Sequence, residues 1–397
     1  MTKHQSVVRS IAIAGTILAA WPQFALAADA EAVAARLKAV VEKQGGLELD
    51  WSAVSGDGTD AVRIEGVKLT NIELQNTIGL GDIAMSGIEE VDGGFAVDEM
   101  TVAPSIFDVE GAEVNMDELT LTGVAIPGED TDASSLDVLI YDTLALPKLS
   151  VDFAGKQVFA LTNLNGEISE EDAGEKLRMT GGVESFSADL SLIEDPKAKD
   201  AIDELGFTTL SGNLAAEGWW TPEDGRTVLE RYDITVNDAG TLGLTMDLGG
   251  YTPELIASLQ ELGAKMESAT EEEKSAAGLS MMGLLQQLTL HGAKIRFDDN
   301  TLTDKVLAYI AAQQGVEPKD IANQAKAILP FALAALQNSN LTTAISEAVN
   351  AYLDNPDNLE IGVEPEKPVP FAMIAASAMA SPQSLPEQLN LTVKANQ

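Results

Sequence analysis

Apolar and polar residues alternate along the first part of the chain, most regularly over residues 62–126. Apolar side chains occupy every second position in several short runs, for example residues 62–69 and 114–121. Alternation with a period of two is typical of β-strands that bury one face. The pattern therefore predicts one strand after another, arranged as an irregular meander.

A short phrase interrupts this alternation three times. It consists of an apolar residue, any residue, Gly and a second apolar residue, and it occupies residues 64–67, 85–88 and 121–124. Gly inside a strand pattern often marks a β-bulge or a tight bend. We therefore predict that these three glycines bend the strands and curve the sheet.

Strand-like alternation continues to about residue 250. Acidic loops are predicted over residues 127–132 and 170–175, and a short helix over residues 196–205. The sequence Thr-Pro-Glu-Asp-Gly at residues 221–225 predicts a hairpin turn. A first helix is predicted ahead of the strands, over residues 29–43, because its apolar residues recur at helical spacing.

Helical spacing replaces alternation near Pro253, which follows the capping residue Thr252. Helices are predicted over residues 253–268, 270–288, 303–314, 318–337, 341–353 and 369–379, and isolated strands over residues 288–297, 359–363 and 389–393. A lone strand is not stable, so the late strands are expected to join the earlier sheet. The pattern predicts an α+β fold: a long, curved, mostly antiparallel β-sheet with C-terminal helices packed against it.

The first residues match a secretory signal peptide. Lys3 and Arg9 precede an apolar run over residues 11–20, and Ala25-Leu26-Ala27 fits the cleavage rule. We therefore expect cleavage after Ala27 and a periplasmic location; an uncleaved anchor is the alternative, although the apolar run is short for a bilayer. The expected parts are residues 1–27 as signal peptide, 28–250 as N-terminal helix and β-meander, and 251–397 as a helix-rich part whose strands join the same sheet.

Charge narrows the range of partners. The 397 residues include 24 Lys and Arg against 63 Asp and Glu, a net charge of −39. Such a surface repels nucleic acid and anionic head groups, so no nucleic-acid partner is expected. No run after the leader reaches the roughly 20 apolar residues of a membrane span. The absence of Cys excludes disulfides in an otherwise oxidising compartment.

Candidate catalytic groups are scarce. After cleavage His291 is the one histidine, and zinc sites or nucleophile–histidine pairs draw on several His or Cys residues. Asp130, Asp132 and Ser134 begin like a calcium loop, but the Gly and Glu required at its sixth and twelfth places are missing. We expect a protein that is not an enzyme and that uses no metal or cofactor, with His291 as a structural or exposed residue.

Two apolar stretches, residues 325–336 and 370–380, are the candidate ligand site. Helices rich in Met and Ala can line an adaptable apolar groove, contact a membrane or simply be buried against a sheet. Few Lys or Arg flank them, which disfavours a membrane contact. If they line a groove, the predicted ligand-binding residues are Ile328, Phe331, Leu333, Phe371 and Met373.

Three phrases carry a resemblance to known proteins: residues 91–95 (Val-Asp-Gly-Gly-Phe), residues 238–242 with 248–255, and the ending from residues 368–371 to 389–396. With these phrases the whole chain resembles a group of uncharacterised exported proteins from alphaproteobacteria. More remotely, the alternating strands and the export signal resemble AsmA-type envelope proteins. That second resemblance implies a long curved sheet that carries lipid along an apolar groove. This sequence departs from the family in one respect: we expect it to lack the membrane anchor that many of those proteins keep.

Two functions follow as hypotheses; a third, an enzyme, would require a pocket with converging carboxylates around His291 or Asp298, and the sequence gives no positive sign of one. The first is a periplasmic, non-enzymatic protein that binds an apolar ligand, a lipid, in a groove between sheet and helices. The alternative is a structural or adaptor protein of the cell envelope that binds another protein. The first predicts a continuous apolar cavity, whereas the second predicts a filled core and an exposed apolar patch.

Overall fold

The computed structural model describes residues 29–43, 46–72, 75–128, 139–267, 271–334 and 337–397. The expected signal peptide and the calcium-like loop lie outside these residues. The chain divides into two compact units: unit 1 takes the described residues of Met1–Glu184 and Ile256–Ser268, and unit 2 those of Ser185–Leu255 and Ala269–Gln397. The division near residue 184 falls within the strand-rich part of the chain, ahead of residue 250, where the helical spacing begins.

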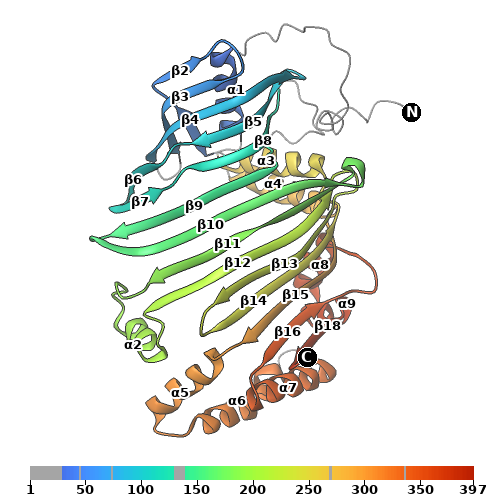
Figure 1. The fold of residues 1–397 in the computed structure, drawn as a ribbon. Helices are drawn as coiled ribbons and strands as arrows, with labels where there is room; N and C mark the ends of the chain where they lie inside the picture. The colour runs from blue at the N-terminus through green and yellow to red at the C-terminus, as the bar shows by residue number, and fades with distance from the viewer. Residues whose placement is uncertain (1–28, 44–45, 73–74, 129–138, 268–270, 335–336) are drawn as a thin grey trace. The chain divides into compact units, whose positions relative to one another are not determined.

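The fold class is α+β, as the sequence predicts. Figure 1 shows a long antiparallel sheet, with eighteen strands in the described residues, and helices concentrated in the C-terminal part. No helix in the described part of the chain combines the length and the apolar character needed to cross a membrane.

Unit 1 packs one amphipathic helix, α1 (Ala30–Lys43), on an antiparallel sheet. The strands are β1 (Leu47–Asp50), β2 (Ala53–Gly56), β3 (Val62–Asn71), β4 (Asn76–Val91), β5 (Gly94–Val102), β6 (Ser105–Val109), β7 (Ala112–Met116), β8 (Leu119–Ile126), β9 (Thr143–Phe153) and β10 (Lys156–Glu171). Val33, Leu37 and Val40 recur at helical spacing on α1 and are buried with Ile64 and Met85 of the sheet. Burial of this apolar stripe holds α1 on the strands.

The glycines of the three recurring motifs, Gly66, Gly87 and Gly123, all have positive φ angles in the left-handed region. Gly66 (φ +62°) lies where the β3–β4 register shifts, so the predicted bulge is confirmed there. Gly87 (φ +66°) in β4 and Gly123 (φ +59°) in β8 keep the register of their ladders. At these two positions the strand bends without an inserted residue, and the positive φ angle explains why Gly occupies them.

Unit 2 is built on a continuous antiparallel ladder, in the order β12 (Thr209–Thr221), β13 (Arg226–Val236), β14 (Gly240–Gly249), β15 (Thr289–Asp299), β16 (Asn358–Val363) and β18 (Leu391–Ala395). The short β17 (Val369–Pro370) also pairs with β15. The expectation that the late strands join earlier ones is therefore confirmed. Two elements cross the boundary between the units, β11 (Lys176–Asp189) and α3 (Pro253–Glu267).

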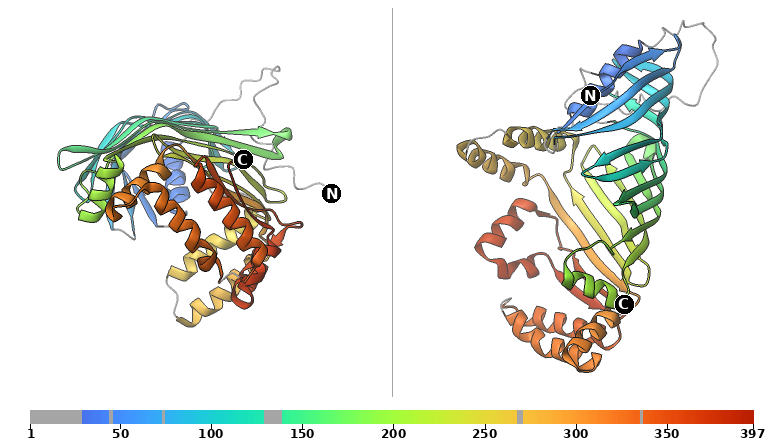
Figure 2. Two further views of the ribbon diagram at one scale, coloured as in Figure 1. Left: turned by 90° about the horizontal axis from the view of Figure 1, so that it is seen from below. Right: turned by 90° about the vertical axis from the view of Figure 1, so that its left-hand side faces the viewer.

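The helices of unit 2 are α2 (Pro196–Leu205), α4 (Glu271–Leu284), α5 (Leu302–Gln314), α6 (Pro318–Leu333), α7 (Ser339–Asp354), α8 (Phe371–Ala380) and α9 (Leu385–Gln388). Helix α7 packs against β16 and β18, and α6 lies between α5 and α7 in the packing order. Figure 2 shows these three helices, drawn orange to red, as neighbours. Pro330 lies inside α6, which continues to Leu333.

Candidate apolar ligand site

The sheet of unit 2 has one apolar and one polar face. Along β14, Leu242, Leu244 and Met246 alternate with Thr241 and Thr245. Successive side chains of a strand point to opposite faces, and partners in an antiparallel ladder share a face. The strand register therefore extends the two faces of β14 across the neighbouring strands.

A row of apolar residues crosses four strands on the first face. Leu244 lies opposite Ile295, Ile295 opposite Ile361, and Ile361 opposite Val393. Ile295 is 54% exposed and Ile361 is 47% exposed. Side chains of this kind are normally buried in a sheet, so this face is only partly covered.

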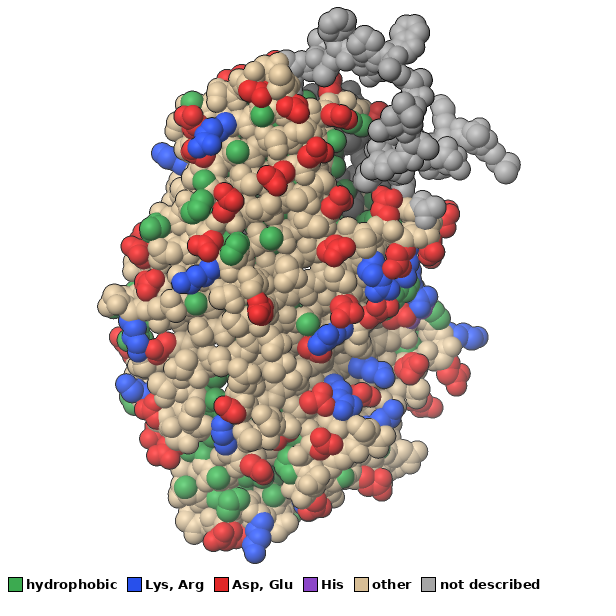
Figure 3. All heavy atoms as spheres, in the orientation of Figure 1, with side chains coloured by type: hydrophobic (Ala, Val, Ile, Leu, Met, Phe, Trp, Pro, Cys, Tyr) green, Lys and Arg blue, Asp and Glu red, His purple; other side chains and the backbone are tan. Residues whose placement is uncertain are grey.

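The second face carries charged residues at the corresponding positions. Arg296 of β15 lies opposite Glu360 of β16, and Glu360 lies opposite Lys394 of β18. Arg296 Nε also donates a hydrogen bond to Asp298 Oδ1 at 2.9 Å. Charged groups of both signs occur across the molecular surface, and Figure 3 shows acidic side chains in red with basic ones in blue among them. Solvation therefore accounts for the charged face but leaves the apolar face unexplained.

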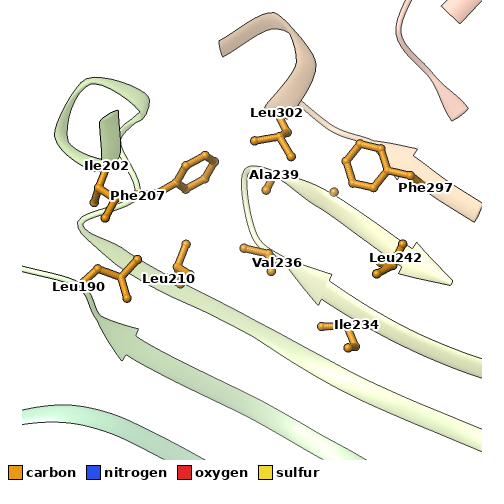
Figure 4. Close-up of a pocket in the computed structure, with 11 residues that line it drawn as sticks. Leu190, Ile202, Phe207, Leu210, Ile234, Val236, Ala239, Leu242, Phe297 and Leu302 are labelled. Carbon is orange, nitrogen blue, oxygen red and sulfur yellow. The ribbon is translucent and has the colours of Figure 1, made fainter. Parts of the chain in front are cut away.

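A groove of about 430 Å³ lies at one end of the apolar face. Its lining is entirely apolar and consists of Leu190, Ile202, Phe207, Leu210, Ile234, Val236, Ala239, Gly240, Leu242, Phe297 and Leu302. Figure 4 shows these side chains converging from the strands, from α2 and from the start of α5. The volume falls within the range of about 300–1,000 Å³ typical of small-molecule sites.

Local structure fixes the walls of this groove. Phe207 follows Gly206, which ends α2 in a left-handed conformation at φ +77°. The backbone N–H groups of Asn300, Thr301 and Leu302 all donate to Ala239 O, at 2.9 to 3.2 Å. These bonds hold the start of α5 on the β13–β14 turn, so Leu302 is fixed against the strands.

Gly240 lies close against Phe297 in the lining of the groove. A Cβ atom at residue 240 would come within 2.8 Å of the Phe297 ring. The nearest atom to that Cβ would be the backbone oxygen of Asp298, so any other residue would push β14 and β15 apart as well as displace the ring that forms one wall of the groove. Leu242, two residues further along β14, is 47% exposed and forms an open part of the lining.

One cationic side chain lies at the rim. Lys305 is on α5, one turn after Leu302, and its Nζ lies 4.3 Å from the centroid of the Phe207 ring. The same Nζ donates a hydrogen bond to Asp238 O at 3.0 Å, next to the lining residue Ala239. The ammonium thus spans the rim from the Phe207 wall to the β13–β14 turn.

His291 lies on β15 at an irregularity of the β14–β15 register. Its Nε2 is 3.2 Å from Thr289 Oγ1, and burial, reinforced by the charge of Arg226, lowers the pKa of the imidazole below its ordinary value of 6.5. Arg226 is itself held by Asp247 through two hydrogen bonds of 2.6 and 2.7 Å. In the described residues no group of three or more His, Cys, Asp or Glu side chains is placed to hold a metal ion.

We expect His291→Gln to reduce the acid sensitivity of folding. Because the folded state lowers the pKa of His291, the unfolded state binds the proton first as pH falls below about 6.5. His291 therefore lowers the free energy of unfolding of the wild type below that pH and has no such effect above pH 7. Urea titrations at several pH values should show the two proteins diverging only on the acid side. Parallel curves from pH 5 to 8 would contradict this.

The predicted ligand residues lie elsewhere in unit 2, and none of the five is among those lining the groove. Ile328 and Phe331 are on α6 and are 63% and 82% exposed; Leu333 ends that helix. Phe371 opens α8, and Met373 on the same helix is 55% exposed. Their contact with a ligand stays a prediction, because exposed side chains on these two helices form no part of this groove.

The lining residues were missed for an identifiable reason. Ile234, Val236 and Leu242 occupy the apolar positions of ordinary alternating strands, and such positions predict a buried face. The alternation contains no signal for whether a second layer covers that face. The small residues Ala239 and Gly240 let the turn approach Phe297 closely, and they were a local signal in the sequence for such a close approach.

Residues 233–396 match a protein-family profile described as "Uncharacterized protein". This range starts in β13 and includes Leu242, Phe297, Leu302 and Lys305 of the site. None of the curated proteins matches the chain. The description of the matching family names no activity, ligand or partner.

Proposed function

We propose that unit 2 binds an apolar chain, with lipid as the ligand class, and that the protein carries its ligand without reacting with it. The observation that supports this is an apolar groove that continues into a half-exposed apolar row on the same face of the sheet. Ligand sites of this kind are concave and lined mostly by hydrophobic side chains.

The size of the groove is sufficient for useful affinity. If a methylene group takes about the 30 Å³ of a liquid water molecule, the volume of about 430 Å³ holds on the order of a dozen methylenes. Each fully buried methylene contributes about 0.8 kcal/mol, so a dozen contribute at most roughly 10 kcal/mol in a groove that is open on one side. Association and chain ordering cost several kcal/mol of this. With a cost of about 4 kcal/mol or more, roughly 6 kcal/mol remain at most, so we expect a dissociation constant of about tens of micromolar or weaker rather than permanent retention.

The proposal includes a periplasmic location. Residues 1–27 have the charged start, the apolar run and the small-residue cleavage site of a signal peptide, and the rest of the chain has no Cys. An exported carrier would shield an apolar chain from water between membranes. Secretion of the full-length chain with loss of residues 1–27 would support this part of the proposal.

Leu242→Asp is expected to abolish binding of an apolar probe. Leu242 lines the groove and is half-exposed, so a carboxylate there disrupts the apolar lining while remaining hydrated in the free protein. The readout is the fluorescence of N-phenyl-1-naphthylamine, a neutral probe that brightens in apolar sites. We expect saturable binding by the wild type and at least a tenfold loss in Leu242→Asp.

Thr245→Asp is the matched control. It places the same charge on the same strand but on the polar face, opposite Lys294. Probe binding by this variant should equal that of the wild type. Equal losses in both variants, or no saturable binding by the wild type, would contradict a groove site.

The alternative function, an adaptor that binds another protein, is favoured by the exposed α6 residues. Ile328 and Phe331 are the large exposed apolar residues of that helix, at 63% and 82%. Such side chains are typical of interface anchors when they cluster. Phe331→Asp would then weaken capture of an envelope protein and leave probe binding unchanged.

A further inference from the structure

We propose that the ligand is a single-chain amphiphile with a carboxylate head group, and that Lys305 binds this head group at the rim of the groove. This inference rests on the proposed function and specifies its ligand. The observation that supports it is the position of the Lys305 ammonium group, which lies at the opening of an otherwise entirely apolar groove.

The position of Lys305 is fixed by the groove itself. Leu302, one turn earlier on α5, lines the groove, and the Lys305 ammonium lies over the ring of Phe207, a second lining residue. Its hydrogen bond to Asp238 O ties it to the β13–β14 turn beside Ala239. An alkyl chain lying along the groove would therefore place a terminal polar group next to this ammonium.

The chemistry of the ammonium selects an anion with several acceptor oxygens. An ammonium has three N–H donors and no acceptor, and the bond to Asp238 O uses one of them. A carboxylate can accept from the others through charge-assisted hydrogen bonds, which are stronger than bonds to a neutral hydroxyl. The ring of Phe207 beneath the ammonium keeps one side of this contact free of water.

Charge and volume restrict the ligand further. With 63 acidic against 24 basic residues, the chain repels an anion that no local cation holds, so the head group is favoured next to a cation such as Lys305. The volume of about 430 Å³ accommodates one alkyl chain of on the order of a dozen methylenes. A fatty acid of medium length satisfies both restrictions.

The test compares dodecanoate with dodecanol as competitors of N-phenyl-1-naphthylamine at pH 8. The two ligands share a chain and differ in head-group charge. We expect Lys305→Met to weaken dodecanoate binding by about tenfold, the loss typical of one charge-assisted hydrogen bond, and to change dodecanol binding by less than about twofold. Lys305→Arg should restore dodecanoate binding.

Lys394→Met is the control, because it removes the same charge from the polar face of β18. It should leave both affinities unchanged. Dodecanoate binding that is equal in the wild type and in Lys305→Met would overturn the role of Lys305 while leaving the groove intact. A wild type that binds neither the naphthylamine probe nor dodecanol would overturn the proposed function itself.

Discussion

Gly87→Ala is expected to lower the free energy of unfolding by about 2–5 kcal/mol. A non-glycine residue in the left-handed region costs roughly 1–2 kcal/mol, and Gly87 lies there at φ +66°. In addition, a Cβ atom at residue 87 would come within 2.6 Å of the Cβ atom of Asp98 on β5. Rotation of the Asp98 side chain cannot remove that overlap, so β4 and β5 must move apart, at a further cost of about 1–3 kcal/mol.

Gly155→Ala separates the two contributions. Gly155 has a similar angle, φ +76°, but a Cβ atom there would meet nothing within 4 Å. It should cost only the roughly 1–2 kcal/mol of the left-handed conformation. Urea unfolding of both variants, followed by circular dichroism, measures the difference. Equal losses would show that contact with Asp98 adds nothing.

Asn358→Asp is expected to be the most destabilising change in unit 2, by about 3–5 kcal/mol at pH 7, the cost of an uncompensated buried charge. Asn358 is buried, and its Nδ2 donates to Asp357 Oδ2 at 3.2 Å and to the backbone oxygen of Gln397 at 3.1 Å. A carboxylate would direct an acceptor at both of these acceptors. The network that joins β16 to the end of β18 would then become repulsive.

Acid should partly rescue Asn358→Asp. Burial and the neighbouring acceptors would raise the pKa of the new carboxyl group in the folded state, so the added instability should appear as pH rises above about 4.

Asn338→Asp is the matched control. Asn338 caps α7 and accepts a hydrogen bond from Leu341 N at 3.0 Å, and a negative charge at a helix N-terminus is favourable. Thermal melts should show a loss in Asn358→Asp that is large at pH 7 and smaller at pH 4, and little change in Asn338→Asp at either pH. Equal effects of the two substitutions at pH 7 would contradict this account.

Helix boundaries in the second half were largely predictable because capping residues and helical spacing mark them locally. Pro318 begins α6, and the helix predicted over residues 253–268 is found as Pro253–Glu267. Helix α4 ends at Leu284, short of the predicted residue 288, because the chain turns there before β15. Local signals define such elements well, since they depend on neighbouring residues.

The positions of the bends in unit 1 were also predictable, but the sequence did not predict which of them insert a residue. The phrase around Gly66 predicts a bulge, and β3 has one there. The same phrase at Gly87 and Gly123 produces a left-handed bend that keeps the register. Whether a glycine inserts a residue depends on the partner strand, which a single stretch of sequence does not contain.

The candidate site was the least predictable part of the chain. The apolar sequences of residues 325–336 and 370–380 led to the prediction of Phe331 and Met373, yet the groove is lined by strand residues such as Leu242. Alternation predicts which side chains share a face, but the extent to which that face is covered depends on tertiary packing. The rim position of Lys305 likewise follows from the placement of α5 on the β13–β14 turn.

The most direct test of the proposed ligand is native mass spectrometry of the mature protein purified from a bacterial periplasm, followed by organic extraction. Because reversible binding of this strength is lost on dilution, the purified protein is equilibrated with excess dodecanoate before the spectrum is recorded. The account predicts one bound dodecanoate per chain, which is absent from Leu242→Asp and present in Thr245→Asp. A clean apo mass in the wild type, together with no uptake of added N-phenyl-1-naphthylamine, would contradict an apolar ligand in unit 2.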